Sequence, residues 1–143
     1  MSPGSRKTAT ATMEQAPHIL VVEDEPTVAS LIADVLREEG MCVDVLSDGQ
    51  RALELVRKQS YDLAICDLRM PGMDGQIFYG ALVHSQSPLR DHVLFVTGDV
   101  LAQRTREFLE GNHLPHVAKP FRVEELSLAV HGVLWGNRKA AVP

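Results

Sequence analysis

The chain of 143 residues lacks most of the features that mark secreted, membrane or nucleic-acid-binding proteins. Its two cysteines, Cys42 and Cys66, are too few for a disulfide framework and favour reduced thiols in the cytoplasm. No apolar run approaches the roughly 18 residues of a membrane span, and residues 1–17 lack a signal peptide's apolar core. With 14 Lys and Arg against 19 Asp and Glu, a surface that grips nucleic-acid phosphates is not expected.

The two ends of the chain differ in composition from its middle. Residues 1–17 are rich in Ser, Thr, Ala and Pro, which is typical of a disordered tail or linker, and residues 136–143 are expected to form a short C-terminal tail. Residues 18–135 hold 18 of the 19 acidic side chains and 10 of the 14 basic ones. This middle part is long enough to bury a core without metal or disulfides, so we expect one acidic domain.

Within the domain, short apolar runs alternate with segments of helical periodicity. The runs are 18–22, 42–46, 61–66, 92–96 and 115–118. Three of them are almost continuously apolar and rich in Val and Ile, which is typical of parallel strands covered on both faces. The expected helices run from Pro26 to Gly40, over 48–58 with Ser47 or Asp48 as N-cap, over 76–86, over 100–110 and around 126–134. Five β-α units predict an α/β fold with a parallel five-stranded sheet.

Side chains that carry chemistry follow four of the five runs. In chain order they are Glu23 and Asp24, Asp67, Thr97, and Lys119. Because the carboxyl ends of parallel strands meet at one edge of an open sheet, we expect these side chains to converge. Three carboxylates in one crevice repel one another unless a cation intervenes, and an all-oxygen site suits Mg²⁺. A lysine and a hydroxyl beside them suit a phosphoryl group, with Asp67 as the nucleophile that forms an aspartyl phosphate.

Each of these residues also has a simpler interpretation when taken alone. Glu23 and Asp24 could cap the first helix, Thr97 could cap the helix that follows it, and Lys119 could be a surface lysine. Their joint placement after four different strands favours the site.

Four segments resemble the motifs of one family. They are 21–26 (an acidic pair after the first strand), 67–75 (a phosphoacceptor loop), 95–98 (a switch threonine) and 119–121 (a lysine-proline turn). Together they make residues 18–135 similar to the receiver domain of two-component response regulators, which are CheY-like proteins. The resemblance implies a flavodoxin-like sheet of order 2-1-3-4-5 and a cis bond before Pro120. In that order Cys42 and Cys66 lie on non-adjacent strands, so no bridge between them is expected.

The resemblance further implies a function in a phosphorelay. Asp67 would accept a phosphoryl group from a histidine kinase or a histidine phosphotransfer protein. Mg²⁺ or Mn²⁺ would be held by Glu23, Asp24, Asp67 and the backbone carbonyl of Arg69. The signal would pass through the face of the fourth helix, fifth strand and fifth helix to a protein target or a second copy. Such a domain is no enzyme beyond its own phosphorylation and dephosphorylation.

Three further residues are expected to act on the switch. Thr97 would move to bond the phosphoryl group, a two-state change that a local charge biases. Where the family usually has Tyr or Phe, three residues before the lysine, this sequence has His116, which we expect to weaken or alter the coupling to Thr97. Arg69 and Asp99 each lie two residues beyond a site residue and could pair across the mouth of the pocket, lengthening the phosphoryl lifetime or contributing almost nothing.

Three rival functions remain beside this one. A degenerate receiver would act only as an interaction module, and His116 keeps that alternative open. A Mg²⁺-dependent phosphohydrolase often has a second acid two residues after its nucleophile, and this function is disfavoured because the chain has Arg69 there. A flavin or nucleotide module would need a Gly-rich loop after the first strand, where this chain has three acidic residues instead. Because few residues follow the last helix, we expect no output domain, as in a single-domain regulator or a receiver excised from a hybrid kinase.

Overall fold

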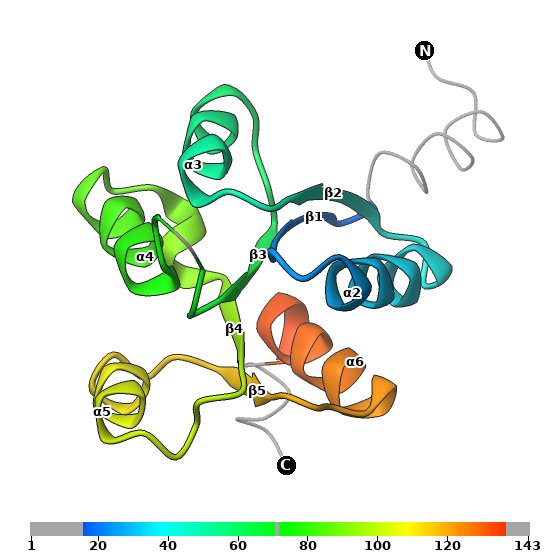
Figure 1. Ribbon diagram of the computed structural model, residues 1–143. Helices are drawn as coiled ribbons and strands as arrows, with labels where there is room; N and C mark the ends of the chain where they lie inside the picture. Colours follow the sequence, from blue (N-terminus) through cyan, green and yellow to red (C-terminus); the bar gives the residue numbers. More distant parts are fainter. Residues whose placement is uncertain (1–15, 71, 137–143) are drawn as a thin grey trace, which may run out of the picture.

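In the computed structural model, which describes residues 16–70 and 72–136, strands and helices alternate along the chain (Figure 1). The strands are β1 (His18–Val22), β2 (Cys42–Leu46), β3 (Leu63–Asp67), β4 (Val93–Thr97) and β5 (His116–Ala118). The α-helices are α2 (Pro26–Glu38), α3 (Gly49–Lys58), α4 (Gly75–His84), α5 (Gln103–Gly111) and α6 (Val123–His131). A 3₁₀ turn, η1 (Pro88–Asp91), precedes β4, and a π-helical turn, η2 (Gly132–Gly136), follows α6. The predicted α/β class with five β-α units is confirmed.

The five strands form one parallel sheet in the order β2-β1-β3-β4-β5. This is the predicted flavodoxin-like order, in which the chain reverses direction across the sheet after β2. Cys42 on β2 and Cys66 on β3 are separated by β1, and both are free thiols. The bond between Lys119 and Pro120 is cis, as expected.

The sheet is covered on both faces by helices. Figure 1 shows α2 and α6 on one side and α3, α4 and α5 on the other. Because successive side chains of a strand point to opposite faces, Ile19 and Val21 pack in the core beneath α2 and α6, and Leu20 and Val22 pack in the core on the other side. All four are fully buried. This two-sided burial explains why the central strands have nearly continuous apolar sequences.

Several element boundaries differ from the predicted ones. The third strand extends one residue beyond the predicted run, so Asp67 is its last residue. The helix predicted over 100–110 begins only at Gln103, because Ala102 is its N-cap and the preceding residues form a loop. The last strand begins at His116, one residue after Pro115, whose ring nitrogen has no N–H to donate to a ladder. Of the two predicted N-caps, Ser47 and Asp48, the structure has Asp48, whose carboxylate accepts a bond of 2.8 Å from the Gln50 amide.

The two predicted tails lie almost wholly outside the described residues, at 1–15 and 137–143. At the start of the described part, the Pro17 carbonyl accepts a hydrogen bond of 2.9 Å from the Cys42 amide, which extends the pairing of β1 and β2. Within residues 16–70 and 72–136, no helix has the length and apolar character needed to cross a bilayer.

Candidate functional site

The predicted site residues converge at the carboxyl edge of the sheet. Glu23 follows β1, Asp67 ends β3, Thr97 ends β4 and Lys119 follows β5. A cleft of about 380 Å³ opens at this edge. It is lined by Asp24, Glu25, Asp67, Arg69, Gly98, Asp99 and Lys119. The strand order therefore brings together side chains that are up to 96 residues apart in sequence.

The ammonium of Lys119 connects three carboxylates in this cleft. Its Nζ lies 2.8 Å from Glu25 Oε1, 3.0 Å from Asp67 Oδ2 and 3.1 Å from Glu23 Oε1. Burial lowers the pKa of Lys119, but the hydrogen bonds to Glu25, Asp67 and Glu23 outweigh it and hold the pKa above its usual value. The lysine therefore stays protonated and serves as the fixed positive charge of the site.

Glu23 is the most deeply buried acid of the site, with 2% of its side chain exposed. Its Oε2 accepts hydrogen bonds from the Glu25 amide at 3.1 Å and from Lys119 at 3.3 Å. Burial raises the pKa of Glu23 to about 7; hydrogen bonding from the Glu25 amide opposes that rise, and the charge of Asp67 adds to it. Among the carboxylates of the site, that of Glu23 is thus the one whose ionisation at neutral pH most destabilises the folded protein.

The other oxygen of Glu23 has unused capacity. Oε1 lies within ion-pair distance of Lys119, but the geometry is not that of a hydrogen bond, and this buried oxygen has no hydrogen-bond partner among the described residues. Oxygen atoms of Glu23, Glu25 and Asp67 lie within 4.8 Å of one another. A buried oxygen without a partner, in a set of carboxylates, fits a hard divalent cation. Asp24 lines the cleft beside this cluster but is not one of its three members.

Asp67 is held from two sides. Its Oδ1 accepts a bond of 3.0 Å from the Arg69 amide, and its Oδ2 accepts the bond from Lys119. Only 7% of its side chain is exposed, yet it lines the cleft, so the carboxylate is oriented and reachable. This is the arrangement that a carboxylate nucleophile requires.

The backbone beneath Asp67 packs closely against the first turn of α4. A Cβ added at Gly75 would lie 2.8 Å from the Asp67 carbonyl oxygen and 2.9 Å from Leu68 Cα, whereas one at Gly80 in the same helix would meet nothing within 4 Å.

We expect Gly75→Ala to lower the free energy of unfolding by about 1–3 kcal/mol through overpacking. Gly80→Ala, the matched control, should raise it by up to about 1 kcal/mol. Urea denaturation measures both; equal midpoints would contradict the close packing.

The hydroxyl of Thr97 is engaged by its own loop. Thr97 is fully buried, and its Oγ1 accepts a bond of 3.1 Å from the Asp99 amide. Thr97 is not among the residues that line the cleft. The predicted pair of Arg69 and Asp99 is present, with 3.4 Å between Nη1 and Oδ2, although 74% of the arginine side chain is exposed.

His116 lies on β5 opposite Phe95 of β4, and its side chain is exposed. Phe95 packs in the core beneath α3, α4 and α5, and the two-residue alternation of strands places Thr97 and His116 toward the same side of the sheet. Nδ1 of the ring lies 3.4 Å from the carbonyl oxygen of Leu114. His116 thus lies on the same side of the sheet as Thr97, with its side chain exposed to solvent.

The sequence reasoning did not include Glu25 in the site. Glu25 is the N-cap of α2, but its side chain makes no capping bond and turns to Lys119 instead. The alternative that Glu23 or Asp24 caps this helix is therefore wrong. The only signal in the sequence was the run of three acids, 23–25, which does not tell which side chain reaches the lysine.

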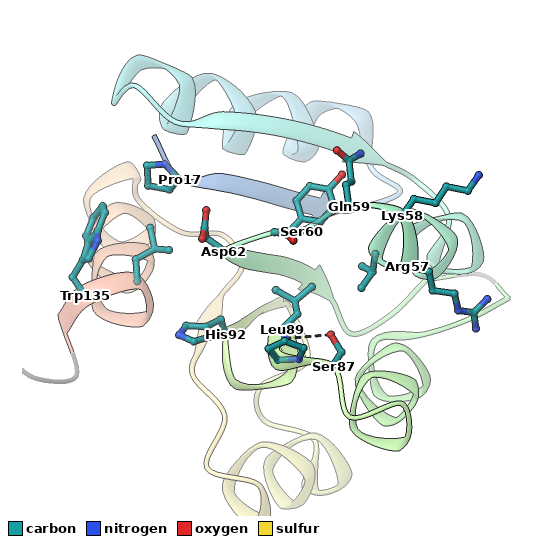
Figure 2. Close-up of a pocket in the computed structure, with 14 residues that line it drawn as sticks. Pro17, Arg57, Lys58, Gln59, Ser60, Asp62, Ser87, Leu89, His92 and Trp135 are labelled. Carbon is teal, nitrogen blue, oxygen red and sulfur yellow. Dashed lines mark hydrogen bonds between the residues drawn. The ribbon is translucent and has the colours of Figure 1, made fainter. Parts of the chain in front are cut away.

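A second, larger hollow of about 520 Å³ lies at the opposite edge of the sheet (Figure 2). Figure 2 shows Trp135 and Pro17 at one end of it and Arg57 and Lys58 at the other. None of the predicted site residues lines this hollow. Because the ordered carboxylates and the lysine lie at the other edge, we place the candidate chemistry in the smaller cleft.

An acidic, lysine-bridged cleft at the carboxyl edge of a five-stranded parallel sheet defines a receiver-like signalling domain. The family model of the response regulator receiver domain matches residues 19–131, and the chain belongs to this family. Receivers of two-component systems partner with histidine kinases and are typically not enzymes apart from their own phosphorylation and dephosphorylation.

Individual relatives agree with this assignment. The heme response regulator HssR of Staphylococcus aureus (strain JH9) is 34% identical over 116 residues, which cover 80% of this chain and 50% of the relative. The chain thus spans about half the length of the curated relatives it matches.

Two solved structures are similar in fold and sequence. The receiver domain of a sensor histidine kinase from Pseudomonas aeruginosa PAO1, with magnesium coordinated in its active site cleft, is 28% identical with a TM-score of 0.73, covering 83% of this chain and 98% of that chain. The response regulator TrrA from Thermotoga maritima, solved with Mg²⁺-BeF, is 31% identical with a TM-score of 0.70, covering 82% and 99%.

Proposed function

We propose that this receiver accepts a phosphoryl group on Asp67 from a histidine kinase or a histidine phosphotransfer protein and signals through a conformational switch. The observation that carries the proposal is the contact of Lys119 Nζ with Asp67 Oδ2, at 3.0 Å in a cleft that Asp67 lines. The test is incubation with Mg²⁺ and acetyl phosphate, followed by the intact mass. We expect the protein to gain one phosphoryl group.

The transfer needs little from the protein beyond positioning and charge. A carboxylate oxygen of Asp67 attacks phosphorus, the bond from phosphorus to the donor nitrogen breaks, and its electron pair stays with the imidazole of the donor. Lys119 already faces the carboxylate, so its charge is in place as charge gathers on the phosphoryl oxygens.

We infer that Glu23, Asp24, Asp67 and the backbone carbonyl of Arg69 hold Mg²⁺ or Mn²⁺. The unpartnered Oε1 of Glu23 and the position of Asp24 on the cleft support this set. When bound, the cation supplies positive charge that offsets the acidic cluster and the phosphoryl oxygens. Without that charge, these carboxylates share a single lysine.

The switch proposed here moves Thr97 Oγ1 from the Asp99 amide toward the phosphoryl group, carrying the loop after β4 with it. His116 follows with weaker coupling than an aromatic ring would give. The α5–β5–α6 face then contacts a protein target or a second copy of the chain. Exposed apolar side chains on or beside this face, Leu101 at 85% and Leu128 at 72%, support such an interface.

We predict that Arg69→Ala shortens the lifetime of the phosphoryl group. Arg69 and Asp99 both line the cleft, and their pair would hinder an attacking water, but an exposed pair is worth at most about 1 kcal/mol. Hydrolysis of the phosphorylated protein should therefore be about two- to fivefold faster. Arg51→Ala, on the exposed surface of α3, is the control. An unchanged rate in Arg69→Ala refutes the gating role.

The same proposal bears on the kind of protein in which this receiver acts. A single-domain regulator and the receiver of a larger hybrid kinase both fit these residues, and the signal reaches its output through protein contacts in either case. We expect the receiver to act in the cytoplasm, where response regulators generally are.

A further inference from the structure

The shortest contact of Lys119 is with Glu25, a residue that the proposed phosphoryl transfer does not use. The distance from Nζ to Glu25 Oε1 is 2.8 Å, against 3.0 Å to Asp67 Oδ2. An ammonium has three N–H donors, and Glu25, Asp67 and Glu23 accept one each. All donors of the lysine are therefore taken before any phosphoryl group arrives.

The three contacts differ in what it costs to break them. The side chain of Glu25 is 58% exposed, whereas those of Glu23 and Asp67 are 2% and 7% exposed. Water can solvate the carboxylate of Glu25 as soon as the lysine leaves it, but not the two buried carboxylates. Glu25 is thus the partner that yields when Lys119 must turn to a new acceptor.

We propose that Glu25 is a positioning residue that holds Lys119 in the unphosphorylated protein and competes with the phosphoryl group for its ammonium. The inference rests on the proposed phosphorylation of Asp67. In the resting state, the Glu25 carboxylate occupies the N–H donor that a phosphoryl oxygen would take. Glu25 thereby slows phosphorylation and weakens the binding of phosphoryl mimics. It also keeps the receiver in its resting, unphosphorylated state until a donor is bound.

Two variants distinguish the effect of the contact between Glu25 and Lys119 from the effect of the negative charge of Glu25. Glu25→Gln removes the charge and keeps the length, whereas Glu25→Asp keeps the charge but withdraws the carboxylate by one methylene. Glu38→Gln removes one exposed charge elsewhere on α2 and is the control. If the contact matters, Glu25→Gln and Glu25→Asp should both raise the affinity for beryllofluoride in saturating Mg²⁺, and the rate with acetyl phosphate, by about two- to fivefold. Glu38→Gln should match the wild type.

A readout on the unmodified protein keeps this inference separate from the proposed function. In NMR spectra without donor, the Lys119 Cε–Hε signals should shift in both Glu25 variants and stay in place in Glu38→Gln. If they stay in place in all three variants, the contact is overturned even where wild-type phosphorylation succeeds. If they shift but the wild type gains no phosphoryl group and binds no beryllofluoride, the proposed function fails instead.

Two further outcomes also overturn the inference. A faster Glu25→Gln with an unchanged Glu25→Asp would mean that long-range charge, not the hold on Lys119, limits the reaction. A weaker affinity for Mg²⁺ in both Glu25→Gln and the charge-retaining Glu25→Asp, measured by titrating the metal alone, would mean that Glu25 is a metal ligand, since its oxygen lies within 4.8 Å of those of Glu23 and Asp67.

Discussion

Asp67→Asn is expected to abolish the phosphoryl adduct completely. The amide that replaces the carboxylate has no nucleophilic oxygen of comparable strength, and its NH₂ group cannot accept the bond that Lys119 donates at 3.0 Å. The carbonyl oxygen of the new side chain can still accept the bond from the Arg69 amide, so the loop should keep its shape. Intact mass after incubation with Mg²⁺ and acetyl phosphate measures the loss.

The control for this loss is Asp34→Asn, which changes an exposed carboxylate on α2 and should be phosphorylated like the wild type. Urea denaturation of both variants shows whether the protein stays folded. Because removing the charge of Asp67 relieves its repulsion of Glu23, we expect Asp67→Asn to be at least as stable as the wild type. An adduct that survives in Asp67→Asn would place the phosphoacceptor elsewhere.

The fold could be predicted from sequence because two periodicities were clear. Apolar runs such as 18–22 and 92–96 indicated strands buried on both faces, and β1 and β4 lie there in the structure. Glycine also marked an end correctly, since Gly40 closes α2 with φ of +89°. The start of α5 was missed because residues 100–102 are compatible with a helix but are held in the loop that carries Asp99.

The site was predicted as a set of residues but not as a network. Placement after parallel strands was enough to bring Glu23, Asp67 and Lys119 together. It could not show that Glu25 takes the shortest bond to the lysine, because that depends on side-chain rotamers around a helix start. Nor could it show which way Thr97 points, because that depends on a bond to the Asp99 amide in its own loop.

Near neutral pH, the ionisation of Glu23 should determine how the stability of the folded protein depends on pH. Burial raises its pKa from the usual 4.5 to about 7 in the folded protein. Between these two values, the folded state holds a proton that the unfolded state has released. Stability therefore falls as pH rises through this window, by up to about 1.4 kcal/mol per pH unit, and levels off above pH 7.

Glu23→Gln should remove this dependence, since an amide carries no charge to desolvate. In EDTA at pH 8, we expect the variant to exceed the wild type in free energy of unfolding by about 3 kcal/mol, with the difference shrinking toward zero near pH 5. Urea denaturation at pH 5, 6, 7 and 8 measures it, with Glu38→Gln as the control for the loss of one carboxylate. A difference that does not change with pH would show that Glu23 is not the titrating group.

A divalent cation should narrow the difference in stability between the wild type and Glu23→Gln. A ligand that binds only the folded state stabilises it in proportion to the logarithm of its concentration over its dissociation constant, and the ionised Glu23 supplies part of that affinity. We therefore expect Mg²⁺ at pH 8 to raise the midpoint of wild-type unfolding more than that of Glu23→Gln. Equal gains would mean that the cation does not use Glu23. The ionised carboxylate of Glu23, which destabilises the metal-free protein, is thus a group that helps the folded protein to bind the metal.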